Sequence, residues 1–476
     1  MRAPSRVVED FDGIRRRSHS RGWSFRVDRR LGKRRVRQRF LFGGEAVHVR
    51  ILAGGISARR VCRLGGPLSA LVTLVGCGGA VTTPVEGGSG STLNSSAVDF
   101  ENASSVFESV PNNELASAEP FEVDAEALVI RGEIDIVSDV DVFQIGAVET
   151  GDHVFVDVSV PDELKGVIAL FDQDGSALLV NDHRNVYLGR KGPFIDLVVR
   201  RPSAAAYVGF SLTPGFQATG EYALLASIEP QAQIPNSRPE SVILDFVGGL
   251  GVTIGSRAGI DVPPFDAATV APRFEGQSDE VIRRVVQMIR EDFAAFNVTI
   301  ESTSDGDAYD GSQSRLYFGT FDPALLGVAE GVDEYNARPS QEAVVFTDTF
   351  NAFDALDPSV EEISQALANV ASHEIGHLLG LVHTKNAVEL MDVTASLSEL
   401  MEDQAFGVSP IYEAVFPVGQ QDAVQYLVDA VGGDESAARV AAQTAAQRAA
   451  NKGPSREKRV PARTHDLLSS CDLPHR

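Results

Sequence analysis

The residues best suited to chemistry lie between Ala371 and His383, in the segment A-S-H-E-I-G-H-L-L-G-L-V-H. His373 and His377 are four residues apart, which on an α-helix places them on one face, about 40° apart in rotation and about 6 Å apart along the axis. Two imidazoles arranged in this way can bind one metal ion from the same side. Glu374 follows the first histidine, so its carboxylate would lie beside the open position of the metal, close enough to accept a proton from water.

A third ligand is expected after the helix ends. Gly380 can adopt the left-handed conformation that terminates a helix, which would turn the chain back so that His383 supplies a third nitrogen. Three protein ligands and one exchangeable water are typical of a catalytic zinc site, whereas a structural site is normally closed by a fourth side chain. Such a zinc ion activates water at neutral pH, and Glu374 would act as the general base. The alternative is that these are core histidines of an ordinary amphipathic helix.

The motif H-E-x-x-H-x-x-G-x-x-H followed by a methionine resembles the metzincin zinc metallopeptidases. Met391 would lie beneath the three imidazoles as the Met-turn of that family. The pattern around Thr384 is nearest to the matrixin branch, and Val393 stands where an astacin-type tyrosine ligand would be. The resemblance implies an α+β catalytic domain, with a twisted mixed sheet above the zinc helix and one catalytic Zn2+. It also implies protein or peptide substrates that pair with an edge strand from residues 327–347.

Composition bounds the size of the fold and its partners. The chain has 476 residues, of which 43% are apolar, enough for one or two sizeable cores. The formal net charge of −24 is uneven, because residues 1–76 contain about 18 Lys or Arg against about 5 Asp or Glu, which leaves about −37 on the remainder. A region as acidic as the residues after 76 would repel phosphate groups, so nucleic acid is not an expected partner. The three cysteines, Cys62, Cys77 and Cys471, cannot build a disulfide framework.

The residues before Cys77 predict export. A basic patch around Arg60 precedes the apolar run from Leu64 to Gly76, which is typical of a secretory signal and too short to span a membrane. The residues Leu74-Val75-Gly76-Cys77 resemble the bacterial lipobox, which implies lipidation of Cys77 and a lipoprotein held at the cell envelope through its acyl chains. The alternative is an ordinary cleaved signal in which Cys77 is incidental. Residues 1–76 are therefore assigned to a basic leader and signal peptide.

Two further regions precede the catalytic domain. Residues 77–118 are rich in Gly, Ser, Thr and Asn, which predicts a flexible, lipid-anchored linker. Residues 119–230 contain short alternating or apolar runs bounded by turn residues, which predicts an all-β sandwich. This region is similar to the bacterial pre-peptidase C-terminal domain, a module that accompanies secreted peptidases and is thought to bind or target. The motifs that carry this similarity are Ser138–Phe143, Leu170–Gly175 and Thr219–Leu224.

Two groups of aspartates are candidates for structural calcium, which is common among metzincins. They are Asp305, Asp307 and Asp310 in the catalytic domain and Asp139, Asp141, Asp172 and Asp174 in the sandwich. The spacing of the first group is not that of an EF-hand loop. Solvated loop carboxylates are the alternative in both groups.

Residues 240–433 are predicted to be the catalytic domain, and the Ala-rich, basic tail 434–476 to be disordered or frayed. The strands predicted for the domain are Ser241–Val247, Val298–Glu301, Arg315–Gly319 and Ala343–Thr347. Its predicted helices are one capped by Ser278, the zinc helix from near Pro358 and a last one over Ala423–Ala430. The sequence thus predicts a multi-domain protein that acts as an exported zinc endopeptidase. The alternative is a cell-surface binding or adhesion protein of weak activity that uses the sandwich, although a pure binder needs no general base at Glu374.

Overall fold

The computed structural model describes residues 36–42, 45–52, 55–56, 100, 103–109, 111–184 and 191–452. The chain divides after Thr92 into two units. In the first unit, β1 (Val36–Phe42), β2 (Glu45–Leu52) and β3 (Gly55–Ile56) form an antiparallel sheet in that order. Cys77, the predicted signal and residues 453–476 of the predicted tail lie outside the described residues. Each helix within the described ranges is too short or too polar to cross a membrane.

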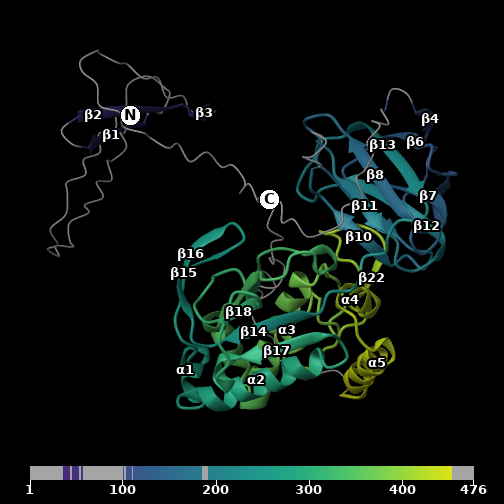
Figure 1. Ribbon diagram of the computed structural model, residues 1–476. Helices are drawn as coiled ribbons and strands as arrows, with labels where there is room; N and C mark the ends of the chain where they lie inside the picture. The colour runs from purple at the N-terminus through teal and green to yellow at the C-terminus, as the bar shows by residue number, and fades with distance from the viewer. Residues whose placement is uncertain are drawn as a thin grey trace, which may run out of the picture. The chain divides into compact units, whose positions relative to one another are not determined.

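The second unit begins with a sandwich of two five-stranded sheets, with strand orders β10-β9-β12-β7-β5 and β11-β8-β13-β6-β4 (Figure 1). The strands are β4 (Ser104–Phe107), β5 (Glu119–Pro120), β6 (Leu128–Ile134), β7 (Val140–Val148), β8 (His153–Ser159), β9 (Gly166–Phe171), β10 (Ala177–Asn181), β11 (Phe194–Val198), β12 (Ser203–Leu212) and β13 (Gly220–Glu229). Alternate residues of both sheets, including Ile130, Phe143 and Phe210, fill one core between them. The pairing is antiparallel except at β4 and β5. The all-β sandwich is confirmed.

The sandwich starts earlier than the sequence predicts. Strand β4 and the single turn Leu115–Ser117 lie within the predicted flexible linker 77–118. Strand β4 is held by parallel backbone pairing with β6, from Ser104 opposite Leu128 onward. Its side chains are mostly exposed, Phe107 by 73%. An edge strand held by its backbone leaves no apolar periodicity in the sequence, which is why this one was missed.

The rest of the second unit is an α+β domain, as predicted. Its sheet has the order β17-β14-β18-β20-β19, parallel except for the edge strand β19, which runs antiparallel to β20. The strands are β14 (Glu240–Asp245), β17 (Val298–Ser302), β18 (Ser314–Phe318), β19 (Gly327–Ala329) and β20 (Glu342–Val345). Helices α2 (Ser278–Asp292) and α3 (Val360–Leu378) share the large core on one face of the sheet. The hairpin β15 (Gly249–Ile254) and β16 (Arg257–Val262) packs on the other face.

Shorter elements complete the domain. They are α1 (Ala267–Val270), β21 (Val408–Pro410), β22 (Gln420–Asp422) and α4 (Ala423–Val431). The N-cap of α2 is Gln277 rather than the predicted Ser278, which is the first helical residue. The hydroxyl of Ser278 instead accepts a hydrogen bond from the backbone N–H of Ala267 (3.0 Å), so it ties α1 to α2.

The start of the tail differs from the prediction of disorder. Residues Glu435–Lys452 form helix α5. Ala438 and Ala445 are buried, and Arg439 forms an ion pair with Asp422 (2.7 Å). Alanine has the highest helix propensity, and its small side chain buries without creating a wide apolar face. The helix was not predicted because it has no periodic pattern of large apolar residues.

Candidate active site

Helix α3 places the first two histidines inside the core. A capping box fixes its start, because the Ser359 hydroxyl accepts from the N–H of Glu362 (3.2 Å) while the Glu362 carboxylate accepts from the N–H of Ser359 (2.7 Å). The last turns of the helix are buried throughout, including His373, Glu374 and His377. A long helix anchored by its own cap and by the core gives these side chains little freedom.

The three histidines converge on one point. Nε2 of His377 lies 3.1 Å from Nε2 of His373 and 2.9 Å from Nε2 of His383. Nδ1 of His373 donates to the carbonyl of Leu390 (2.7 Å), and Nδ1 of His377 donates to the carbonyl of Leu381 (2.8 Å). Because a carbonyl only accepts, these Nδ1 atoms carry the protons and the Nε2 atoms present lone pairs. Lone pairs this close repel one another unless a cation lies between them, and three imidazoles suit Zn2+.

Burial keeps these imidazoles neutral, as metal ligation requires. It lowers the pKa of His373 to about 4 and that of His377 to about 3, and it also depresses the pKa of His383. Within the part of the chain that the structure describes, this triad is the group of three or more His, Cys, Asp or Glu whose ligand atoms gather closely enough for one ion. His373, His377 and His383 are thus the zinc ligands.

The chain reaches the third ligand through a tight reversal. Leu381 donates its N–H to the carbonyl of Gly376 (2.9 Å), and Gly380 has a φ of +101°. A Cβ at Gly380 would lie 2.8 Å from the carbonyl oxygen of Asp333 and 2.6 Å from the hydroxyl of Tyr426. Both the backbone conformation and the lack of space therefore require glycine at the position from which the chain returns to His383.

Glu374 is buried next to the triad without a partner. It is 1% exposed, and neither of its carboxylate oxygens has a hydrogen bond within the described residues. Burial raises its pKa well above the usual range for a glutamate. The edge strand passes so close that a Cβ at Gly327 would lie 2.4 Å from Oε1 of Glu374. The carboxylate is thus confined between the zinc helix and the edge strand, and its proton affinity is high.

Comparison with known proteins agrees with this geometry. The model of the matrixin family matches residues 303–413, which include β18, β19, β20, helix α3 and all three histidines. These residues are the zinc-binding part of the α+β domain and are of the matrixin zinc metallopeptidase type. We call the whole α+β domain, from β14 to α4, the matrixin domain. The metallopeptidase resemblance, the catalytic zinc and the metzincin-like fold class are thereby confirmed. No curated protein matches the chain at a significant level.

Several solved structures resemble parts of the chain. The archaemetzincin of Methanopyrus kandleri is 15% identical with a TM-score of 0.21, over 36% of this chain and 91% of that one. The pre-peptidase C-terminal domain of a Bacillus anthracis collagenase is 11% identical with a TM-score of 0.19, over 26% and 100%. An Aeromonas hydrophila periplasmic inhibitor of g-type lysozyme is 10% identical with a TM-score of 0.18, over 27% and 97%. The first two are the kinds of domain that the sequence motifs resemble.

The turn around Met391 in the matrixin domain is braced by residues to which sequence reasoning gave no role. Met391 is fully buried, and a Cβ at Gly376 would lie 2.5 Å from its sulfur. Thr384 donates its N–H to the carbonyl of Met391 (2.9 Å) and its hydroxyl to Glu389 (2.5 Å), which also accepts from the N–H of Met391 (2.9 Å). Burial raises the pKa of Glu389 to about 7. The sequence offered one signal for this role, because Glu389 is an isolated carboxylate between the third ligand, His383, and Met391.

A small cavity of about 30 Å³ adjoins Glu374. It lies between α3 and the loop that follows Met391, and its lining includes Gly327, Asn369 and Leu400. The Asn369 amide donates to the carbonyl of Leu400 (2.8 Å) and to that of Glu402 (2.7 Å), which fixes the outer wall of the cavity. A space of this size holds one or two water molecules or a small side chain.

The aspartates considered for calcium are engaged with protein groups. In the matrixin domain Asp305 pairs with Arg290 (2.8 Å), while in the sandwich Asp172 accepts from the N–H of Asp174 (2.9 Å) and Asp141 accepts from the hydroxyl of Tyr222 (2.7 Å). Asp139 and Asp141 are buried rather than solvated. Among the described residues, none of the seven aspartates belongs to a group of three metal-ligating side chains with ligand atoms within 4.8 Å. Calcium at these positions stays a prediction.

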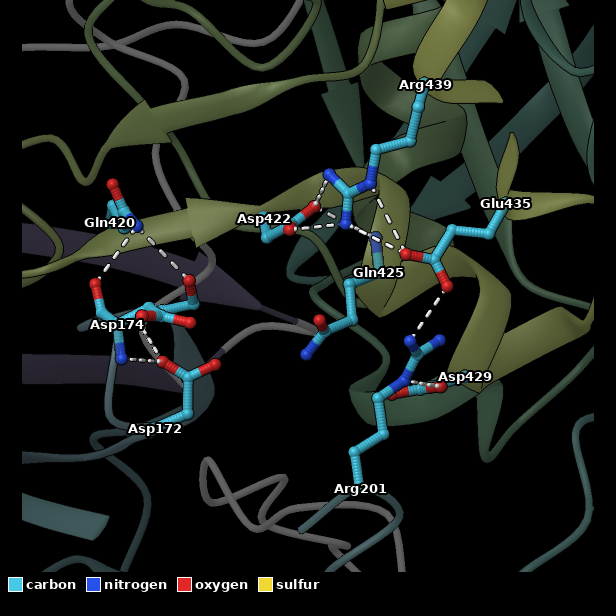
Figure 2. Close-up of polar contacts among 10 residues, drawn as sticks. Asp172, Asp174, Arg201, Gln420, Asp422, Gln425, Asp429, Glu435 and Arg439 are labelled. Carbon is cyan, nitrogen blue, oxygen red and sulfur yellow. Dashed lines mark hydrogen bonds and ion pairs between the residues drawn. The ribbon is translucent and has the colours of Figure 1, made fainter. Parts of the chain in front are cut away.

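The sandwich packs against the segment that holds the third zinc ligand. The N–H of Tyr412 donates to the carbonyl of His383 (3.0 Å). Close to it, Phe416 contacts the outward face of the sandwich, with its ring centroid 5.5 Å from that of Phe171. Polar contacts also join the two domains, and Figure 2 shows several of them, including the ion pairs of Arg201 with Asp429 (2.8 Å) and with Glu435 (2.8 Å). We call this set of contacts the domain junction.

Proposed function

We propose that the protein is a zinc-dependent endopeptidase in which Glu374 is the general base. The observation that carries the proposal is the buried, unpartnered carboxylate of Glu374 beside three converging imidazoles. When bound, zinc supplies Lewis-acid activation of water and of the scissile carbonyl. Glu374 accepts a proton from the attacking water and returns it to the departing amine.

An extended substrate can lie along the free edge of β19. The carbonyl of Leu326 accepts from Phe346 and the N–H of Glu330 donates to Glu342, so these positions face β20. The alternation of a strand then turns the N–H and C=O of Gly327 and Ala329 toward the open edge. A peptide that adds to this edge would pass directly over Glu374, which lies against Gly327. The small cavity beside Glu374 favours a small side chain next to the cleaved bond.

Cleavage of a denatured protein mixture by the purified full-length chain tests the proposal. We expect zinc-dependent cutting within chains that a chelator stops and added zinc restores. Glu374→Gln should retain one zinc per chain and lose a factor of about 10² to 10⁴ in turnover, the usual contribution of general-base catalysis. Turnover at the parent rate in this variant, or cutting that persists after zinc removal, would contradict the proposal.

We also propose that the protein is exported and carries lipid on Cys77. The support is the basic and apolar segment that ends in Leu74-Val75-Gly76-Cys77. Expression in a bacterial host followed by intact-mass measurement should find a mature chain that begins at Cys77 and carries acyl groups. Cys77→Ala should stay unlipidated. A mature chain that keeps residues before Cys77 would rule out lipidation, and an unacylated chain cleaved elsewhere would leave only an ordinary signal.

A further inference from the structure

A pocket of about 420 Å³ lies at the domain junction. Residues from both domains line it: Val180, Asp182 and Phe194 from the sandwich, and Val332, Glu334 and Val415 from the matrixin domain. Its volume is within the range of pockets that bind small ligands or side chains. Neither domain alone supplies all its walls, so the pocket exists only because the sandwich packs on the matrixin domain.

The substrate edge leads into this pocket. Strand β19 begins at Gly327, beside Glu374. Gly331, four residues further along the chain, is the first residue after β19 that lines the pocket. Four residues of extended chain span roughly 13 Å. Antiparallel pairing is the more stable mode for an added strand. A substrate paired in this way on β19 carries the residues N-terminal to its cleaved bond past the pocket.

The wall that follows β19 is fixed from both sides. The N–H of Asp333 donates to the carbonyl of His377 (3.0 Å), which ties it to the zinc helix. The hydroxyl of Tyr335 donates to the carbonyl of Leu178 in the sandwich (2.9 Å), and its ring stacks on that of Tyr426 at 4.4 Å between centroids. A pocket held by such contacts is formed before any ligand arrives, which lowers the entropic cost of binding.

The charges of the pocket do not cancel. Asp333 accepts from the backbone N–H of Arg338 (2.7 Å) and lies 3.4 Å from its guanidinium, while Asp182 pairs with His183 (2.8 Å). Glu334 lines the pocket, and its carboxylate makes no hydrogen bond or ion pair within the described residues. Burial raises the pKa of Glu334 to about 7, and the nearby positive charges of His183 and Arg338 oppose that rise. The remaining lining includes Val167, Val180, Phe194, Val332, Val382 and Val415. The pocket thus combines an apolar wall with one carboxylate that has no direct ion-pair partner among the described residues.

We propose that this pocket is a substrate subsite for a lysine or arginine side chain about four residues N-terminal to the cleaved bond, with Glu334 as its partner. The inference rests on the peptidase function proposed above. The aliphatic part of either side chain packs along the apolar wall, and the cationic end reaches the carboxylate. Such charge-assisted hydrogen bonds are the stronger kind, and they select for charge as well as for length.

Paired measurements of cleavage and binding test the subsite. A set of peptides would carry one lysine at each of six positions N-terminal to a mapped cleavage site, with an all-alanine reference. Relative kcat/KM would be measured for the full-length chain, for Glu334→Gln and for Glu275→Gln, which removes an exposed carboxylate away from the pocket. Fluorescence anisotropy with the Glu374→Gln chain, with and without Glu334→Gln, would report affinity independently of turnover.

We expect lysine near the fourth position to raise kcat/KM and affinity about tenfold, as one charge-assisted hydrogen bond would. The gain should vanish in Glu334→Gln and persist in Glu275→Gln. Cleavage of all peptides without a lysine preference, or a preference that Glu334→Gln retains, would overturn the subsite and leave the peptidase function standing. If no peptide is cleaved, the peptidase function fails. Anisotropy then decides the pocket, and equal affinity for lysine and alanine peptides overturns it.

Discussion

The zinc cleft and the domain junction both gather charged groups in partly buried surroundings, yet they differ in how those groups are satisfied. At the junction, Arg201 binds Asp429 and Glu435, and Arg439 binds Asp422 and Glu435, so each of these five charges meets its opposite (Figure 2). In the cleft, Glu374 has no hydrogen-bond partner among the described residues, and the Nε2 atoms of the three imidazoles converge on one point. The paired charges of the junction hold the structure together, whereas a buried carboxylate beside metal ligands, with no partner among the described residues, is a candidate for a reaction.

If the domain junction stabilises the protein, Phe416→Ala should have the largest effect on it. Phe416 is fully buried, and it fits the sandwich so closely that a Cβ on Gly209 would lie 2.8 Å from its ring. Removing the ring should lower the free energy of unfolding by about 3–5 kcal/mol. It should also split a single calorimetric transition into two, one for each domain. Phe321→Ala, which removes a ring that is 55% exposed, is the control. One undivided transition with little loss of stability would show that the sandwich is only loosely attached.

The comparison also requires Glu374 to stay free, and Gly327→Ala should disturb it from the edge strand. The new methyl group would lie 2.4 Å from Oε1 of Glu374, so one of the two must move. A displacement of about 1 Å at a reacting group can cost a factor of about 10² in turnover. Zinc content, measured by elemental analysis, should not change. Gly407→Ala is the matched control, because its nearest neighbour there would lie 3.7 Å away. Equal turnover in both variants would show that Glu374 is not confined by β19.

Asp141, which lies far in sequence from the zinc ligands, is another buried carboxylate, and its Oδ1 has no hydrogen-bond partner within the described ranges. Burial, followed by the charges of Glu108 and Asp139, raises the pKa of Asp141 to about 8. A group whose pKa is higher in the folded state stabilises the fold at low pH, and that stability is lost as pH rises from about 4 to about 8. In the folded protein Asp141 is thus a neutral acid below about pH 8.

Asp141→Asn should therefore flatten the pH dependence of stability. At pH 9 we expect the variant to be about 1–3 kcal/mol more stable than the parent, the usual cost of an unsatisfied buried group. Near pH 5 the difference should be small. Urea unfolding at both pH values measures the effect, with Asp135→Asn, an exposed aspartate of the same sandwich, as the control. If the free energy of unfolding changes equally between the two pH values in the variant and the parent, ionisation of Asp141 does not cause the pH dependence.

The two regions also differ in how far they could be predicted from the sequence. The zinc ligands depend on local geometry, since a spacing of four on a helix and a glycine reversal are both encoded within eleven residues of chain. The sandwich of residues 119–230 was predicted for a similar reason, because alternation and apolar runs are local. The junction is different, because Arg201 and Asp429 are 228 positions apart and nothing in either segment marks the other. The subsite pocket could not be predicted for the same reason, because its walls come from segments of both domains that are far apart in sequence.

The distance in sequence between the two partners of that ion pair bears on the order of assembly. Domains generally fold as units from the N-terminus while the chain is being synthesised. The sandwich can therefore fold first, but Arg201 stays without its carboxylates until Asp429 and Glu435 have also been made. The ion pairs of the domain junction thus form late in biosynthesis. A nascent chain that pauses before that point has a folded sandwich and an unfinished peptidase.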